Sequence, residues 1–264
     1  MSRHDFYFGI ASYNRLDRQP MLTKLHGMGF PATQILLATQ TPENYEKYSE
    51  RYGKWATVLF KPASNCPQNK NTILEHLRDN CDNTRVLMLS DKTRGIGLWR
   101  RSGKMDWVET KEQMEALVRN AFALTEQAGG VMFGCSPTEN RFYMGHDTST
   151  NLFCLGCFMG ILDPSLQMFD EELSLKEDFG FILQHVSKGR TTVRFNDVCL
   201  KQTLHTTGGS HELWFAEGDR VNERCTRYLL RKYPKLVKPH ATRKNELRYT
   251  GKSMKLDLSI TDLI

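Results

Sequence analysis

Short apolar runs alternate with helix-like segments through the first half of the chain, and no other feature limits its fold so strongly. The apolar runs span residues 6–10, 34–39, 55–60 and 86–89, and the helix-like segments between them span residues 20–26, 41–48 and 69–78. Parallel strands need a long crossover connection, usually a helix, so this alternation is typical of a parallel sheet with helices on both faces. The sequence therefore predicts an α/β fold built on a mostly parallel sheet.

The second half of the chain continues this pattern less regularly. Residues 111–128 have the apolar spacing of a long amphipathic helix. We expect strands over residues 131–135, 142–146, 153–159 and, as the last one, 191–195, and helices from residue 177 and over residues 220–233. A chain of 264 residues with 39% hydrophobic content can bury one large core. We therefore predict one domain over residues 1–215, with residues 216–264 as a small basic extension packed on it.

The run from Val86 to Leu89 has the pattern of a strand that is buried on both faces. It ends abruptly at Ser90, Asp91 and Lys92, so polar groups follow directly after the strand. In open α/β sheets, ligands bind outside the carboxyl ends of the strands. An acid in this place more often begins a turn when it is considered alone, but the predicted sheet makes Asp91 a candidate ligand-binding residue.

The loop after the first predicted strand lacks the motifs of the common nucleotide-binding folds. No G-x-G-x-x-G follows residues 6–10, and no G-x-x-x-x-G-K-S/T occurs in the chain. The loop reads Ser12, Tyr13, Asn14, Arg15 instead. Ser12 and Asn14 can hydrogen-bond a base or a ribose, and Arg15 can pair with a phosphate. The alternative is a polar strand-to-helix loop with a capping serine.

Net charge bears on the kind of partner, and cysteine usage indicates a reducing compartment. The chain has 36 Lys and Arg against 30 Asp and Glu, a net charge of +6, which suits a polyanionic partner without requiring one. The seven cysteines are odd in number and scattered, and they form no zinc-site pattern. The first residues lack a signal-peptide core, and no apolar run is long enough to span a membrane. We expect a cytoplasmic protein, in the host cytoplasm if it is viral.

Two basic segments are candidate contacts for nucleic acid. Arg100, Arg101 and Lys104 form a basic loop between Trp99 and Trp107, a combination that suits phosphate contact with stacking. The alternative for this loop is a solvated hairpin tip with the tryptophan edges packed beneath it. The second segment is the basic tail, whose helix carries Arg224, Arg227 and Arg231. Basic helix faces are usually only solvated, but here the excess of base continues for about thirty residues.

Several motifs in order resemble nucleotide-sugar glycosyltransferases of the A-type fold (GT-A). The matching segments are residues 9–15, 36–39, 69–71, 87–92 and 177–181. The group that these motifs most resemble is the glycosyltransferases associated with base hydroxylases, which include enzymes acting on hydroxymethylated bases in phage and kinetoplastid DNA. The resemblance covers about the first four-fifths of the chain, and it rests on the order and spacing of the motifs.

The resemblance implies a sugar transfer and assigns residues to it. A UDP-sugar is the expected co-substrate, and double-stranded DNA with hydroxymethylated or already glycosylated bases is the expected acceptor. The donor-binding residues would be Ser12, Tyr13, Arg15, Thr39, Lys70, Asn71, Ser90, Asp91 and Lys92. Gly156 and Gly160 would permit close approach of the donor sugar, although packing against a neighbouring strand would use glycine equally well. The DNA contacts would come from Arg100, Arg101, Lys104, Arg224, Arg227 and Arg231.

The catalytic residues implied by the resemblance are Asp178, as the base of a single displacement, and its neighbour Glu177. Considered without the resemblance, the two acids would only complement a helix dipole. Two other functions stay open: transfer to a glycan or protein, and a non-catalytic relative that binds nucleotide or nucleic acid. The sequence does not indicate which sugar is transferred or the oligomeric state.

The strand tip departs from the pattern of the resembling family in one respect. That family usually carries a run of acids there, one of which binds a divalent cation that bridges the donor diphosphate. Here Asp91 stands between Ser90 and Lys92, and an adjacent ammonium opposes the binding of Mg²⁺ or Mn²⁺. A metal would need Asp91 together with His205 or His211. We expect instead that Lys92 neutralises the leaving diphosphate without a metal; the alternative is a site that has lost catalysis.

Overall fold

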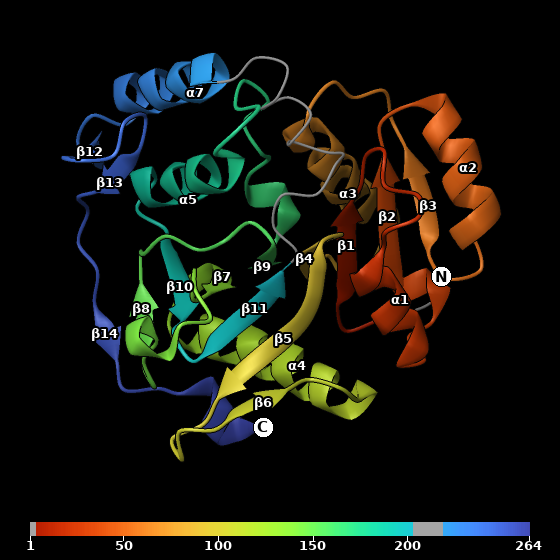
Figure 1. Ribbon diagram of the computed structural model, residues 1–264, viewed down its shortest axis with the longest axis horizontal. Helices are drawn as coiled ribbons and strands as arrows, with labels where there is room; N and C mark the ends of the chain where they lie inside the picture. Colours follow the sequence, from red (N-terminus) through yellow and green to blue (C-terminus); the bar gives the residue numbers. More distant parts are fainter. Residues whose placement is uncertain (1–3, 203–218) are drawn as a thin grey trace.

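A nine-stranded sheet forms the centre of the computed structural model, which describes residues 4–202 and 219–264 (Figure 1). Its strand order is β14-β8-β10-β7-β9-β4-β1-β2-β3. Strands β1 to β4 pair in parallel, β7 and β10 run in the same direction, and β9 and β8 run against them. Most strands of this nine-stranded sheet therefore point the same way, which confirms the predicted α/β fold with a mostly parallel sheet.

The first half of the chain follows the predicted alternation closely. Its elements are β1 (Tyr7–Ala11), α1 (Pro20–Gly27), η1 (Ala32–Gln34), β2 (Ile35–Thr39), α2 (Pro42–Tyr52), β3 (Thr57–Phe60), α3 (Cys66–Asn80) and β4 (Val86–Ser90). Thr41 and Asn65 cap α2 and α3 by accepting hydrogen bonds from backbone N–H groups of the first turn. Local capping and apolar periodicity therefore place each helix between two strands.

The second half adds a hairpin, a long helix and the far side of the sheet. Its elements are β5 (Thr93–Trp99), β6 (Met105–Trp107), α4 (Lys111–Gln127), β7 (Gly130–Cys135), η2 (Arg141–Tyr143), β8 (Thr148–Thr150), β9 (Phe158–Ile161), η3 (Pro164–Leu166), α5 (Glu177–Ser187), β10 (Thr191–Phe195) and β11 (Val198–Gln202). β5 lies between β6 and β11 in a separate small sheet. Every helix of the described residues is too short or too polar to cross a membrane.

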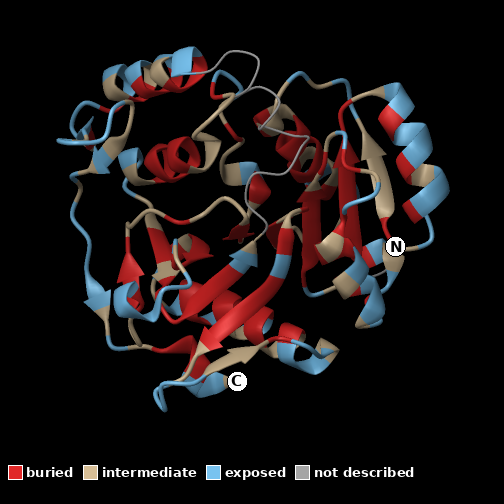
Figure 2. Cartoon of the chain, viewed as in Figure 1, coloured by how far each residue is buried: buried red, intermediate tan, exposed pale blue. Residues whose placement is uncertain are grey.

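The core lies on both faces of the central sheet, as Figure 2 shows. Strand β4 illustrates this, because Leu87 and Leu89 join the cluster under α1 and α4, while Val86 and Met88 join the cluster under α3 and α5. All four side chains are at most 3% exposed. The prediction that this strand is buried on both faces is therefore confirmed.

Three predicted strands of the second half need correction. Residues 142–146 form no strand: Phe142 and Tyr143 belong to η2 and are 84% and 71% exposed, so no buried face holds them against the sheet. Of residues 153–159, only the end is extended, because β9 begins at Phe158. The strand over residues 191–195 is not the last one, since β11 and three shorter strands follow it. β9, β11 and β14 pair with strands far away in the sequence, and a local pattern does not reveal such pairing.

The C-terminal residues pack along one side of the main body (Figure 1). Their elements are α7 (Asp219–Lys232), β12 (Val237–Pro239), β13 (Leu247–Tyr249), β14 (Lys255–Leu256) and η4 (Ile260–Leu263). Leu229 of α7 shares a small apolar cluster with Leu183 of α5, and β14 pairs with β8 at the edge of the main sheet. The boundary between residues 215 and 216 stays a prediction.

Candidate functional site

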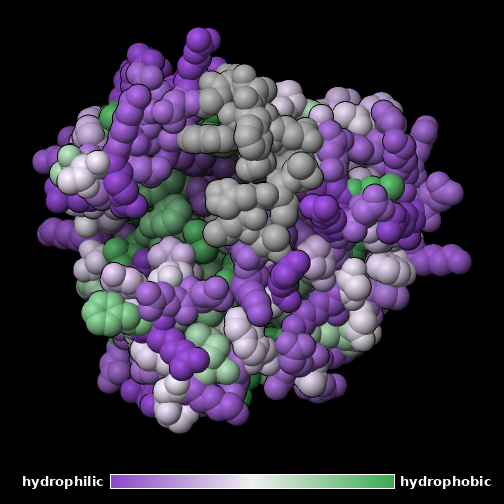
Figure 3. All heavy atoms as spheres, in the orientation of Figure 1, coloured by the Kyte–Doolittle hydropathy of each residue, from purple (hydrophilic) through white to green (hydrophobic). Residues whose placement is uncertain are grey.

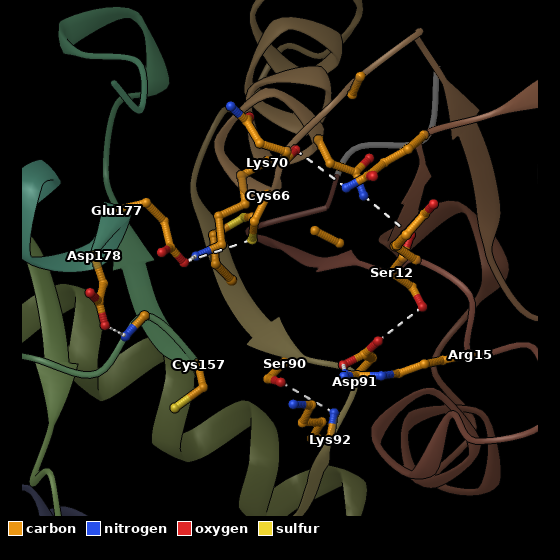
Figure 4. Close-up of a pocket in the computed structure, with 18 of the residues that line it drawn as sticks. Ser12, Arg15, Cys66, Lys70, Ser90, Asp91, Lys92, Cys157, Glu177 and Asp178 are labelled. Carbon is orange, nitrogen blue, oxygen red and sulfur yellow. Dashed lines mark hydrogen bonds and ion pairs between the residues drawn. The ribbon is translucent and has the colours of Figure 1, made fainter. Parts of the chain in front are cut away.

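A pocket of about 620 Å³ lies at the carboxyl ends of β1, β2 and β4, facing the first turns of α3 and α5. This is the edge at which parallel α/β sheets bind ligands. Nine of the predicted site residues line it: Ser12, Tyr13, Arg15, Lys70, Ser90, Asp91, Lys92, Glu177 and Asp178. Figure 4 labels all of these side chains except that of Tyr13, and the labelled ones come from the two sides of the pocket. The structure thus brings together residues that lie up to 166 positions apart in the sequence.

On one side of the pocket, Asp91 is held by Arg15 and Ser12 (Figure 4). Arg15 Nη1 donates to Asp91 Oδ1 at 2.8 Å, and Ser12 Oγ donates to Asp91 Oδ2 at 3.0 Å. Asp91 is only 4% exposed, and this burial raises the pKa of its carboxyl above the usual value, while Arg15 and Ser12 oppose the rise. The carboxylate thus anchors the guanidinium of Arg15 at the wall of the pocket.

Two further residues position this cluster, and the sequence did not indicate either of them. Gln19 Nε2 donates to Ser12 Oγ at 2.6 Å, and the same oxygen lies 3.0 Å from the hydroxyl of Tyr48. The Tyr48 hydroxyl also accepts a hydrogen bond from the backbone N–H of Arg15 at 2.9 Å. Tyr48 is fully buried in α2. Its polar role appears only when α2 packs beside the loop.

On the other side of the pocket, Lys70 of α3 forms an ion pair with Glu177 at the start of α5. Lys70 Nζ lies 2.9 Å from Glu177 Oε1, and Cys66 Sγ donates to the same oxygen at 3.7 Å. Burial alone would lower the pKa of Lys70, but the charge of Glu177 outweighs burial and raises it. Lys70 is therefore a fixed positive charge in the pocket.

Asp178 is held by backbone N–H groups. Its Oδ2 accepts from Gly156 N at 3.1 Å and its Oδ1 from Phe179 N at 2.7 Å. Burial raises the pKa of Asp178 to about 6, and the like charge of Glu177 adds to this rise, whereas Lys70 opposes it. The carboxylate is therefore ionised at neutral pH and basic enough to accept a proton.

The two glycines noted in the sequence have different surroundings. A Cβ atom at Gly156 would come within 2.7 Å of the Cβ of Asp178 and 3.2 Å of Lys70 Nζ, so this glycine permits the close approach of the carboxylate. Gly156 also lines the pocket. A Cβ atom at Gly160 would instead collide with the ring of Phe133 at 2.0 Å. Gly160 thus serves strand packing, which was the alternative for this position.

Lys92 lies beside Asp91 and also lines the pocket (Figure 4). It is partly buried, and burial together with the nearby guanidinium of Arg15 lowers the pKa of its ammonium. The side chain of Ser90 accepts a hydrogen bond from the backbone N–H of Lys92 at 3.2 Å. The turn after β4 thereby presents a second cation next to Arg15.

Two predicted donor-binding residues do not reach the pocket. Thr39 is fully buried, and its hydroxyl donates to the backbone oxygen of Leu59 at 3.2 Å. Asn71 donates to the backbone oxygen of Phe169 at 3.0 Å and accepts from the backbone N–H of the same residue at 2.8 Å. Asn71 therefore fixes the segment before α5. The asparagine that lines the pocket is Asn69, which directly precedes Lys70.

The described residues do not fit a divalent cation. Both carboxylate oxygens of Asp91 already accept hydrogen bonds from Arg15 and Ser12, and the ammonium of Lys92 follows directly. Mg²⁺ and Mn²⁺ need several oxygen ligands, and no group of three His, Cys, Asp or Glu residues in the described ranges could hold a metal. His205 and His211, the other predicted ligands, lie outside the described residues.

The predicted basic loop is the tip of the β5–β6 hairpin (Figure 1), at the opposite end of β5 from the pocket residue Lys92. β5 is seven residues long, so its two ends are about 20 Å apart. The three cations have acidic partners: Arg100 pairs with Asp106, Arg101 with Asp262 and Lys104 with Asp106. The structure therefore does not join this loop to the site.

The arginines of α7 form a stripe on its outer face. Arg220, Arg224, Arg227 and Arg231 are exposed, and their spacing of four, three and four residues places them on one side of the helix. The surface over α7 is largely hydrophilic (Figure 3). These arginines do not line the pocket, but α7 packs on α5, the helix that begins with Glu177 and Asp178.

Residues 10–209 match the family described as TET-Associated Glycosyltransferase. No curated protein matches the chain. Residues 1–349 of TarS from S. aureus are similar in structure, with 12% sequence identity, a TM-score of 0.47 and coverage of 87% of this chain and 72% of that one. Mannose-1-phosphate geranyltransferase from Thermus thermophilus has 13% identity, a TM-score of 0.32 and coverage of 88% and 65%.

Proposed function

Because the chain belongs to the TET-associated glycosyltransferase family, we propose that it transfers a sugar from a UDP-sugar to a hydroxymethylated or already glycosylated base in DNA. Membership of the family confirms the predicted resemblance, and the protein is a glycosyltransferase. Glycosyltransferases of this kind use a nucleotide-sugar donor. The uridine base, the DNA acceptor and the roles of single residues are the proposal.

The observation that carries the proposal is the placement of Asp178 in one pocket with Arg15, Lys70 and Lys92. A general base works best with a pKa near the working pH, and the pKa of Asp178 is raised to about 6. The three cations are suited to the negative charge that develops on a leaving diphosphate. Base and leaving-group stabilisation are the two functions that a single displacement requires.

In the proposed reaction, the oxygen of the acceptor hydroxyl attacks the anomeric carbon of the donor sugar. The proton of that hydroxyl passes to the carboxylate of Asp178. The bond between the anomeric carbon and the diphosphate oxygen breaks, and its electron pair leaves with the nucleoside diphosphate. Glu177 holds Lys70 in place by its ion pair, and it keeps the pKa of Asp178 high by its negative charge.

We propose that Lys92 neutralises the leaving diphosphate, with Arg15 and Lys70 as additional cations. Arg15 is anchored by Asp91, so its charge is held in position before the donor binds. This arrangement uses Asp91 as an anchor for a guanidinium where the resembling enzymes use an acid to hold a metal. The proposed reaction therefore uses no metal.

For the acceptor, a base that is stacked in a duplex cannot reach Asp178, so the nucleotide would have to be flipped out. Flipping costs roughly a few kcal/mol, and phosphate contacts can offset it. The net charge of +6 and the arginine stripe of α7 support a polyanionic acceptor. An acceptor glycan or protein would not need these exposed cations.

The test offers the purified protein a pool of UDP-sugars together with DNA that contains either hydroxymethylcytosine or plain cytosine. The nucleosides are then weighed by mass spectrometry, and we expect a sugar mass only on the modified base. Asp178→Asn should stop transfer while UDP binding persists, and Glu172→Gln, an exposed acid six residues earlier, should leave transfer unchanged. Transfer to a glycan or protein but not to modified DNA would refute the acceptor and leave the donor chemistry standing.

A further inference from the structure

A second cavity, the groove, lies directly beside the pocket that contains Asp178 and shares two lining residues with it. This groove has a volume of about 570 Å³ and lies between the loop after β1, the first turn of α1 and the start of β5. Arg15 and Lys92 line both cavities. A ligand in the groove would therefore lie next to the cations proposed to stabilise the leaving diphosphate.

The groove is strongly basic. The charged residues that line it are Arg15, Asp17, Arg18, Lys24, Lys92 and Arg94, so the described lining holds five cations and one acid. Asp17 is itself paired with Arg51, outside the groove. Lys24 is paired with Glu109 at 2.9 Å and Arg15 with Asp91 at 2.8 Å.

Three of these cations, Arg18, Lys92 and Arg94, form no ion pair within the described residues, although Lys92 is next to Asp91 in the sequence and feels its charge. They converge on one hollow, although like charges repel each other and a solvated surface would let them spread apart. The start of α1 adds to the positive potential, because it has no side-chain cap and no acid in its first turn. Such a concentration of positive charge is suited to a ligand with negative charge at several points.

We propose that this groove binds the phosphodiester backbone of the nucleic-acid acceptor and guides the strand into the donor pocket. This inference rests on the proposed function and adds a surface for the acceptor strand that includes Arg18 and Arg94. A nucleoside diphosphate alone is a poorer fit, because the neighbouring pocket already supplies Arg15, Lys70 and Lys92. Small ligands are mostly buried in their sites, whereas Arg18 and Arg94 are exposed at the rim. Exposed arginines at a rim are typical of contacts to a backbone that continues past the protein.

The groove also differs in position from the two basic segments that the sequence indicated, because it shares Arg15 and Lys92 with the pocket. The hairpin tip is about 20 Å from the start of β5, where the groove lies, and the cations of the tip are paired with acids. The arginines of α7 lie on the outer face of that helix. Of these three basic surfaces on the described residues, the groove is the one that shares wall residues with the pocket.

The test compares Arg18→Ala/Arg94→Ala with Arg78→Ala/Arg119→Ala, a control that removes the same charge from exposed positions on α3 and α4. Binding of a fluorescent duplex with hydroxymethylcytosine is measured against salt concentration, and UDP binding is measured by thermal shift. Loss of two phosphate contacts should reduce the slope of log affinity against log salt by about 1.8. The affinity advantage of the native protein over the groove variant should then shrink about 12-fold between about 50 and 200 mM salt.

We expect the control to keep the native slope and both variants to keep native UDP binding. If the groove variant keeps the native slope while the native protein binds DNA, the groove assignment is wrong and the proposed function survives. If the groove variant loses UDP binding instead, the groove belongs to the donor diphosphate and the inference is overturned. If the native protein binds no DNA at all, the acceptor proposal and the groove assignment fail together.

Discussion

The rate of sugar transfer should rise with pH through about 6, following the ionisation of Asp178. Burial is the largest cause of the raised pKa, and the neighbouring charge of Glu177 adds to it. A carboxyl must be ionised to accept the proton of the acceptor hydroxyl. The rate therefore falls as pH falls through this pKa, and it reaches its maximum above the pKa. An ordinary aspartate, with a pKa of 3.8, would leave the rate flat over the same range.

The size of the effect follows from the ionised fraction. With a pKa of about 6, roughly a tenth of Asp178 is ionised at about pH 5 and nine tenths at about pH 7. The value of kcat/KM should therefore rise about tenfold across these two pH units. Asp178→Asn removes the base and should reduce the rate by about 100- to 10,000-fold, with no acidic limb left in the residual activity.

Glu177→Gln is the perturbation that tests the cause. It removes the like charge beside Asp178, so the pKa of Asp178 should fall and the acidic limb should move to lower pH. The assay measures kcat/KM over about pH 5–8 at constant ionic strength, with thermal unfolding as the check that the variant is folded. Glu172→Gln removes the same charge from an exposed site and should leave the limb in place. An acidic limb at the native pH in Glu177→Gln, or an acidic limb that persists in Asp178→Asn, would refute the assignment of this limb to Asp178.

Three further predictions concern the walls of the pocket. A chelator should leave most of the turnover of the native protein, and loss of that turnover would contradict the prediction. Lys92→Asp should instead create Mn²⁺ dependence, because it adds oxygen ligands beside Asp91. Arg15→Met should cost about 3–5 kcal/mol in denaturant unfolding because it leaves Asp91 buried and unpaired, and adding Asp91→Asn should restore most of that stability. A double variant no more stable than the single one would show that the pair is not coupled. Gly156→Ala should lower kcat more than it changes donor KM, because its Cβ would displace Asp178, and an unchanged kcat in steady-state kinetics would argue against it.

The sequence by itself determined the layered architecture and predicted the edge of the sheet at which the candidate site lies. Apolar runs separated by capped, amphipathic helices are sufficient to predict a parallel sheet, because crossover helices and strand burial are local consequences of composition and spacing. The unbroken apolar run that ends at Asp91 placed polar groups at the ligand-binding edge. The order of the motifs likewise sufficed to indicate a glycosyltransferase.

Only the tertiary structure decided which side chains act on one another. Arg15 and Asp91 are 76 residues apart in sequence, and their pairing depends on the parallel register of β1 and β4. Asn71 and Lys70 are neighbours in the sequence, yet the turn of α3 directs Lys70 into the pocket and Asn71 toward Phe169. No sequence motif indicates the groove with Arg18 and Arg94, because the groove forms where α1 packs beside β5. Charge and spacing along a chain do not specify these contacts, because they arise from strand order and helix packing between distant segments.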